Sequence, residues 1–288
     1  MKIVKLVVIT LMAINISQAQ IKEKSLLWEV SGNEMESPSY IFAILKFIPG
    51  DDYYFPALAK TKFAECEKLS IETHLDHHAR HELNKAAHLD NHESIEKYLT
   101  PEEYNKLKSI FNEQLSIPEY KFNLVYKKFK PVMLSTTMTR LTLGDNIRFY
   151  ENELISMAKE LGLDIVALET IEQEVEALEK LPLDVQVKAL KHTIANFEAQ
   201  LSDYKKLVAA YKLGDLHQAL EYTLHPMEND EGFKQHFIFD RNKEWLNKMT
   251  EQMHESATFF ALGASHLSES QGLLKMLTDK GYTVKPMK

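Results

Sequence analysis

The chain has 288 residues, of which 44% are hydrophobic and 10% aromatic, so it is long enough to form one large globular domain with a full core. Its formal net charge of −8 argues against a nucleic-acid backbone as partner, because binding to phosphates needs a basic face. A single cysteine, Cys66, excludes an internal disulfide, and its position in a helical pattern indicates a buried, inert thiol.

The first 19 residues have the pattern of a signal peptide. Two lysines precede an apolar run over residues 6–14, and the small residues of Ser17-Gln18-Ala19 have the right spacing for cleavage before Gln20. The run is too short to cross a bilayer comfortably, and no later segment approaches transmembrane length without charges. We therefore expect an exported protein, periplasmic or secreted, with residues 20–288 forming a single domain. A buried N-terminal strand or an uncleaved anchor is the alternative.

Short apolar runs bounded by turn residues predict the strands of a small sheet. The aromatic-rich run that begins at Ala257 stops at Gly263, three residues before His266, and the run over 39–46 has a similar shape but ends at Lys46. This similarity hints at an internal duplication. The remaining predicted strands are 26–30, 68–72, 163–169 and an edge strand at 281–287.

Between His74 and about Tyr204 the chain is mostly helical in pattern. Thr100 followed by Pro101 and two glutamates is a strong helix start, with an N-cap, a proline at the first position and a glutamate at the third. Further helices are predicted from Pro131, over 148–161, 183–212 and 231–255, and from Ser268 to Lys280. The order of elements predicts an α/β (α+β-like) fold, helix-rich overall, with a small mixed central sheet and a large helical insertion.

Four predicted strands end in side chains of chemical interest, namely Lys46, Glu72, Glu169 and His266. Residues at the same ends of strands gather along one edge of an open sheet. Carboxylates and imidazole are ligands for Mn, Co or Zn, and they also suit general acid–base work on a bound water. The alternative is that these are ordinary strand-end residues that pair with nearby helix ends.

Two further clusters are candidates. His74, His77, His78 and His81 have spacings that place them on one helix face, where two histidines at i and i+4 can bind a divalent metal. We favour a solvated face that binds metal only weakly, because no glutamate stands at a catalytic spacing; His74 would share a strand face with Glu72 if that strand continues. Arg241, followed by Asn242, can stabilise an oxyanion or a phosphate, or simply form a salt bridge.

In order along the chain, several segments together resemble the TraB/GumN family, which is related to the Tiki-type metalloproteases and more distantly to erythromycin esterase. The resemblance extends from about Leu26 to Pro286. The segments are Leu27-Trp28-Glu29-Val30-Ser31-Gly32, Ser39-Tyr40-Ile41-Phe42, Glu72, Lys130-Pro131, Leu168-Glu169-Thr170 with Gln173, Arg241-Asn242, Gly263-Ala264-Ser265-His266, Gly272-Leu273-Leu274 and Lys280-Gly281-Tyr282.

The resemblance implies metal-dependent hydrolysis of a peptide or related bond. Glu72, Glu169 and His266 would be metal ligands or acid–base groups, and Arg241 an electrostatic stabiliser. The chain departs from the family pattern at the first of two Gly-x-x-His motifs, where Ala43 and Lys46 replace the glycine and the histidine.

A lysine is cationic and a poor metal ligand. We therefore expect a degenerate hydrolase with reduced or no activity, with a divalent metal (Mn, Co or Zn) or none. One alternative is a non-catalytic protein that keeps the pocket for a peptide or small-molecule ligand; the other is a metal-binding protein that uses the His74–His81 face.

The lysine also suggests how the site is balanced without a metal. Carboxylates that lose a shared cation repel one another. We expect Lys46 to point into the pocket, to pair with Glu72 or Glu169, and so to replace the positive charge of the metal.

Overall fold

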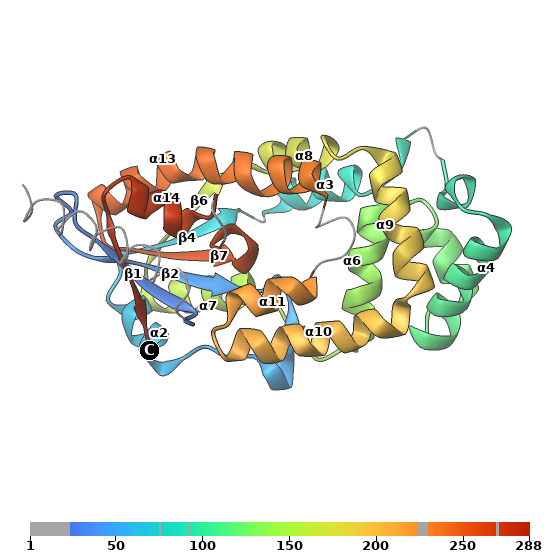
Figure 1. The fold of residues 1–288 in the computed structure, drawn as a ribbon, viewed down its shortest axis with the longest axis horizontal. Coiled ribbons are helices and arrows are strands. Elements are labelled where there is room, and N and C mark those ends of the chain that lie inside the picture. Colours follow the sequence, from blue (N-terminus) through green and yellow to red (C-terminus); the bar gives the residue numbers. More distant parts are fainter. Residues whose placement is uncertain (1–23, 75, 91–92, 224–229, 269–270) are drawn as a thin grey trace, which may run out of the picture.

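The computed structural model describes residues 24–74, 76–90, 93–223, 230–268 and 271–288. The predicted signal peptide at residues 1–19 lies outside the described residues. Figure 1 shows an elongated molecule with a sheet at one end and a group of helices that includes α4, α6 and α9 at the other. No helix in the described part of the chain is long and apolar enough to cross a membrane.

The central sheet has six strands in the order β6-β4-β7-β2-β1-β8. The first four strands in this order are mutually parallel, and β1 and β8 extend the sheet with antiparallel pairing, which confirms the mixed sheet expected from the sequence. A separate two-stranded ribbon pairs β3 with β5. The strands are β1 (Leu27–Ser31), β2 (Ser39–Ile44), β3 (Ile48–Pro49), β4 (Lys68–Thr73), β5 (Ile147–Arg148), β6 (Asp164–Glu169), β7 (Thr258–Gly263) and β8 (Thr283–Met287).

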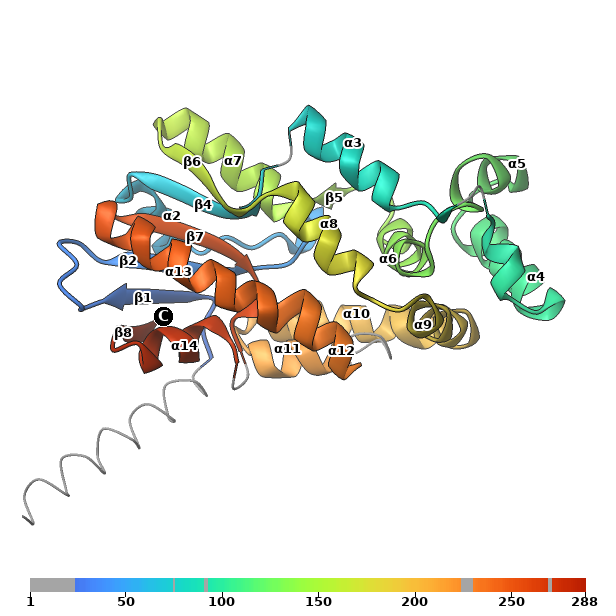
Figure 2. The same ribbon diagram turned by 90° about the horizontal axis from the view of Figure 1, so that it is seen from above.

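Helices cover both faces of this sheet. Figure 1 shows α13 and α14 on one side and α2 and α7 on the other, and Figure 2 shows α13 running along the sheet from above. Beyond these, α10 and α11 lie beneath the end of β2 (Figure 1). The helices concerned are α2 (Ala57–Ala64), α7 (Tyr150–Leu161), α10 (Phe197–Lys212), α11 (Leu216–Thr223), α13 (Asp240–Glu255) and α14 (Leu273–Asp279).

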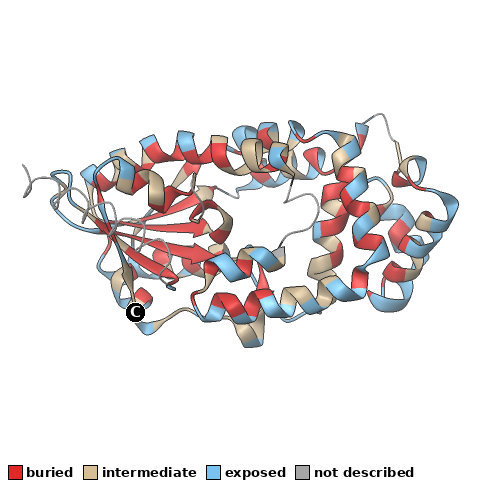
Figure 3. Cartoon of the chain, viewed as in Figure 1, coloured by how far each residue is buried: buried red, intermediate tan, exposed pale blue. Residues whose placement is uncertain are grey.

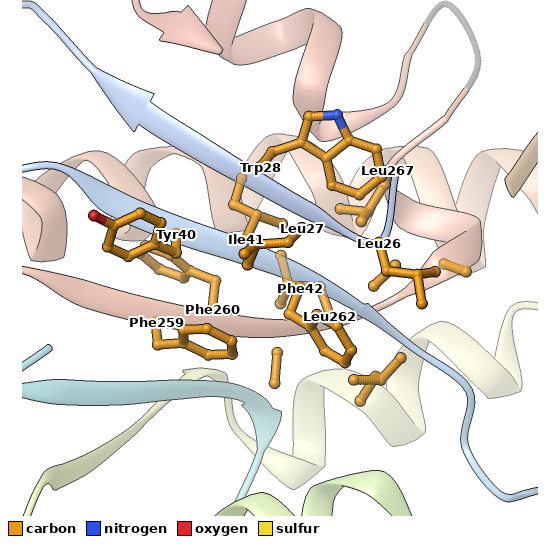
Figure 4. Close-up of a cluster of buried hydrophobic side chains, with 14 of the residues drawn as sticks. Leu26, Leu27, Trp28, Tyr40, Ile41, Phe42, Phe259, Phe260, Leu262 and Leu267 are labelled. Atoms are coloured by element: carbon orange, nitrogen blue, oxygen red, sulfur yellow. The ribbon is translucent and has the colours of Figure 1, made fainter. Parts of the chain in front are cut away.

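The apolar strands explain why the main core forms here. All six residues of β2 and five of the six in β7 are buried, as expected for parallel strands covered on both faces. Figure 3 shows this burial along the strands, and Figure 4 shows Ile41, Phe42, Phe259 and Phe260 packed together from the two neighbouring strands. Cys66 is buried beside this core, and burial raises the pKa of its thiol to about 12, consistent with an inert residue.

The helical insertion has its own smaller core, which includes Phe111, Phe122, Leu134 and Leu190. Its best-predicted element is α4, where Thr100 and Glu103 form the expected capping box. The elements are α3 (His77–Ala86), the 3₁₀ turn η3 (Ile95–Tyr98), α4 (Pro101–Ser109), the π-helical turn η4 (Ile110–Gln114), α5 (Glu119–Lys121), the π-helical turn η5 (Phe122–Tyr126), α6 (Pro131–Thr142), α8 (Ile171–Glu179) and α9 (Leu183–Ala195).

Two predicted helices are interrupted. The segment 183–212 is two helices, because Asn196 leaves the helical conformation with φ −118° and ψ 29°. The segment 231–255 consists of α12 (Glu231–Phe233), the π-helical turn η6 (Lys234–Phe239) and α13. The sequence reading also missed α8, although the capping box between Thr170 and Gln173 marks its start.

Because four strands are parallel, their carboxyl ends meet at one edge of the sheet. Along this edge Glu169 ends β6, Glu72 stands one residue before the end of β4, Gly263 ends β7, and β2 ends at Ile44, two residues before Lys46. The fold therefore brings the four strand ends named from the sequence to the same side of the molecule.

Candidate functional site

A buried guanidinium is the centre of this edge. Arg241, the second residue of α13, is 6% exposed and lies with its guanidinium carbon 4.6 Å from the ring centroid of Trp245 and 4.7 Å from that of Phe237. Its Nη1 donates to the carbonyl of Phe237 at 3.0 Å, inside η6. The π-helical turn and the two aromatic rings thus hold the guanidinium against the strand ends, where it contacts Glu169 and Glu72.

Glu169 is the main partner of this arginine. Its carboxylate accepts hydrogen bonds from Arg241 Nη2 at 2.6 Å and from Nε at 3.1 Å, and also from Trp245 Nε1 at 3.0 Å and Thr73 Oγ1 at 3.3 Å. Burial raises the pKa of Glu169, although the Arg241 and Trp245 contacts act in the opposite direction. Both oxygens are committed to internal donors, so this carboxylate orients the arginine.

Glu72 is more accessible and is held by the backbone of the neighbouring strand. Its Oε1 accepts the N–H of Gly263 at 2.6 Å, and its Oε2 lies 3.4 Å from Arg241 Nη2. A Cβ atom at position 263 would stand only 3.0 Å from Glu72 Oε1, so the glycine permits this close approach. Glu72 is half-buried, and it is the more exposed of the two carboxylates that contact Arg241.

His266 lies in the 3₁₀ turn η7 (Ala264–His266), directly after β7, and is 3% exposed. Asn242 donates to the carbonyls of His266 and Gln271, so its Oδ1 is left to accept from His266 Nδ1 at 2.7 Å. The other ring nitrogen, Nε2, lies 3.4 Å from Arg241 Nη1, which can only donate. Burial, and then the charge of Arg241, hold the pKa of His266 well below its usual value, so the imidazole is neutral.

The structure therefore brings Glu72, Glu169, Arg241 and His266 together around one guanidinium. Sequence reasoning named these four residues, and it left open whether Arg241 stabilises an anion or forms a salt bridge. The geometry shows the salt bridge to Glu169. Trp245 was not predicted from the sequence. It follows Arg241 by four residues, and this spacing on a helix places the two side chains next to each other.

The expectation for Lys46 is wrong. Its side chain is exposed, and it forms no ion pair among the described residues; the cation that pairs with both Glu72 and Glu169 is Arg241. The physical reason is the path of the chain. Strand β2 ends at Ile44, and the buried Phe47 and Ile48 follow at once, so Lys46 is left on the outside.

The histidine cluster is exposed, as expected, but it is not one helix face. Strand β4 ends at Thr73 and α3 begins only at His77, so His74 belongs to neither element and does not extend the strand face of Glu72. His74, His77, His78 and His81 are all exposed, and His78 Nε2 lies 2.8 Å from Glu172 of α8.

The side chains at the sheet edge do not fit a metal ion in this arrangement. A site for Mn, Co or Zn needs several donors that converge on one point. Here the Arg241 guanidinium lies between Glu72, Glu169 and His266 Nε2, and the two oxygens of Glu169 already accept internal hydrogen bonds. Within the described ranges, no group of three or more His, Cys, Asp or Glu is arranged to hold a metal.

Comparison with known proteins places this site in a family. The sequence model of the TraB/PrgY/gumN family matches residues 26–286. The chain belongs to this family. No curated protein and no solved structure gave a match. The match extends from the first strand to the last, so all of the residues around Arg241 lie in the shared region.

Proposed function

We propose that this TraB/PrgY/gumN family member is a degenerate, metal-independent hydrolase, in which Arg241 supplies the positive charge that a metal ion would bring to the sheet edge. The observation that carries this proposal is the position of the guanidinium, 2.6 Å from Glu169 and 3.4 Å from both Glu72 and His266. The signal-peptide pattern at residues 1–19 supports an exported protein.

Electrostatics argue against a divalent ion beside this arginine. A metal at the same place would face a buried cation, and it would have to displace the Arg241 contacts of both carboxylates. It would also find His266 Nε2 turned toward the guanidinium. Replacement of the first Gly-x-x-His histidine by Lys46 removes one further ligand from the set that the family resemblance implies.

The remaining groups divide into two roles. Glu72 is the accessible carboxylate and is fixed by the Gly263 N–H, so it is the group placed to take a proton from a water molecule. Glu169 and His266 hold Arg241 and Asn242 in place and are positioning residues. Arg241 itself is a buried donor suited to an oxygen that gains negative charge, such as that of an ester or amide carbonyl under attack.

A non-catalytic binding protein is the second candidate. The hydrogen bonds within the site favour it, because Glu169, Arg241 and His266 already bond to one another or to neighbouring residues. In that case the same edge would bind a peptide or a small molecule without cleaving it. A metal-binding role for the His74–His81 face has less support, because the chain does not place the four side chains on one element.

Metal analysis and hydrolysis assays together test the proposal. Purified protein, its His266→Ala variant and its Ala43→Gly/Lys46→His variant are analysed for bound metal and titrated with Mn²⁺, Co²⁺ and Zn²⁺. Hydrolysis of p-nitrophenyl acetate and of labelled casein is measured with and without EDTA, with Glu72→Gln as the variant that removes the base.

We expect no stoichiometric metal in the wild-type protein, no gain of metal binding in Ala43→Gly/Lys46→His because residue 46 lies on the outside, and slow hydrolysis that EDTA leaves unchanged and Glu72→Gln abolishes. If the wild-type protein contained one equivalent of bound metal and His266→Ala contained none, the proposal of a metal-independent site would be overturned. If the wild-type protein hydrolysed neither substrate, the hydrolase proposal would be rejected in favour of the non-catalytic binding protein.

A further inference from the structure

A third glutamate, Glu151, approaches the same edge from the opposite face of the sheet. Glu151 is in the first turn of α7, directly after Tyr150, which is fully buried and donates its hydroxyl to the carbonyl of Tyr54 at 3.0 Å. Helix α7 packs against β4 and β6, and it runs back to the start of β6. Its N-terminal turn therefore lies near the edge where β6 ends, and the buried tyrosine fixes the position of Glu151 there.

Charged groups from three elements and from the segment after β2 act on this carboxyl group. They are Glu72 of β4, Lys46 after β2, Glu174 of α8 and Arg241 of α13. Burial, and then the negative charges of Glu72 and Glu174, raise the pKa of Glu151 to about 8, and Lys46 and Arg241 offset only part of this. The positive end of the α7 dipole also acts against the rise, but it is outweighed.

A neighbouring glutamate on the same helix shows how unusual this position is. Glu153, two residues further on, is held by Arg148 Nη2 at 2.6 Å. Glu151 is half-buried, and its side chain has no hydrogen bond or ion pair among the residues that the structure describes. Among these described residues, its carboxyl group therefore has no hydrogen-bond partner, in contrast to that of Glu169.

We propose that Glu151 is the proton-holding carboxyl group of this site and acts opposite the Glu72 carboxylate. Two carboxyl groups whose surroundings separate their protonation states form an acid and a base. The Glu72 carboxylate accepts the Gly263 N–H at 2.6 Å and lies 3.4 Å from Arg241 Nη2, whereas Glu151 has neither contact.

The chemistry of this pair rests on the hydrolase proposed above. Glu72 takes one proton from water as the water oxygen bonds to the carbonyl carbon of an ester or amide. When the bond from that carbon to the leaving oxygen or nitrogen breaks, the electron pair stays with the leaving atom and Glu151 gives it a proton. Transfer of the proton from Glu72 to Glu151 through solvent then restores both groups, and the net reaction consumes one water.

Titration of the carboxyl carbon tests the proton-holding role without relying on activity. The wild-type protein, Glu151→Gln and Glu153→Gln are labelled with ¹³C at the glutamate side-chain carboxyl carbon and followed by NMR from pH 4 to pH 10. We expect one resonance that titrates near pH 8, that disappears in Glu151→Gln and that remains in Glu153→Gln. A Glu151 resonance that titrates below pH 5 would overturn the inference.

Hydrolysis of labelled casein then tests the acid role separately, because the amine that leaves from an amide must gain a proton, whereas p-nitrophenolate leaves p-nitrophenyl acetate as a stable anion. In the wild-type protein the rate should fall as the pH rises through about 8, and Glu151→Gln should lower the rate on the order of 100-fold and remove this limb. Glu153→Gln should keep both. A wild-type rate and pH profile in Glu151→Gln would overturn the acid role. Absence of wild-type hydrolysis would count against the proposed function, and the NMR titration would still decide whether Glu151 holds a proton.

Discussion

The ends of β2 and β7 differ sharply although the two strands are parallel neighbours with similar sequences. Ile44, at the end of β2, pairs with Gly263, at the end of β7. After β7 the chain places His266 in a buried turn beside Arg241, whereas after β2 it leaves Lys46 exposed.

The difference shows that the end of β7 belongs to the Arg241 cluster, whereas the end of β2 is held by helix α10. The Gly263 N–H holds the Glu72 carboxylate. On β2 the carbonyl of Ala43 accepts the hydroxyl of Tyr211 at 2.7 Å, and beyond the end of β2 the carbonyl of Phe47 accepts the hydroxyl of Tyr204 at 2.7 Å, so this end is tied to α10. Because Lys46 after β2 is turned outward, the carboxylates of Glu72 and Glu169 are balanced by a cation from another element, Arg241 of α13.

Removal of this cation should have the largest effect. Arg241→Ala leaves the buried Glu169 carboxylate without its charge partner, and we expect a loss of about 3–5 kcal/mol in the free energy of unfolding, measured with urea. The control is Lys243→Ala on the same helix, whose exposed pair with Asp240 should contribute less than about 1 kcal/mol. Equal losses in the two variants would mean that Arg241 does not balance the strand ends.

Two separate variants, Gly263→Ala near the end of β7 and Ala43→Gly near the end of β2, test the two strand ends directly. Gly263→Ala would bring a Cβ to 3.0 Å from Glu72 Oε1 and displace the carboxylate, so we expect a cost of about 1–3 kcal/mol. The matched change on β2, Ala43→Gly, should cost only about 0.5–1 kcal/mol through added backbone freedom. Thermal unfolding of both variants gives the comparison, and a harmless Gly263→Ala would show that Glu72 does not need the close approach.

Much of this architecture was predictable from the sequence. The apolar runs at 39–46 and 257–266 gave strands because both are buried on two faces, and parallel pairing then placed Glu72, Glu169 and His266 at one edge. The direction of a side chain beyond a strand end was not predictable in this way. Lys46 turns outward because Phe47 and Ile48 turn inward, a choice made by tertiary packing. For Glu151, neither its spacing nor its neighbours in sequence signalled proximity to the site.

The buried imidazole should give the β7 end a dependence on pH. The pKa of His266 is well below 6.5 in the folded protein, so below about pH 6.5 the unfolded chain binds a proton that the folded chain does not. Stability should therefore fall with decreasing pH, by up to about 1.4 kcal/mol per pH unit. Urea unfolding between pH 7 and pH 5 measures this slope. It should be smaller in His266→Gln, and an unchanged slope would show that His266 is not held neutral.

The smallest effect on stability is expected at Lys46. Because its side chain is exposed and forms no ion pair among the described residues, Lys46→Ala should change the free energy of unfolding by no more than about 0.5 kcal/mol. Its positive charge nevertheless lowers the pKa of Glu151, so the same variant should raise the pH at which Glu151 titrates above the value of about 8. NMR titration and urea unfolding of one sample measure both quantities. A loss of 1 kcal/mol or more in the free energy of unfolding, with an unchanged Glu151 titration, would mean that Lys46 is a buried partner of a carboxylate. The ends of β2 and β7 would then both contribute a side chain to the Arg241 cluster.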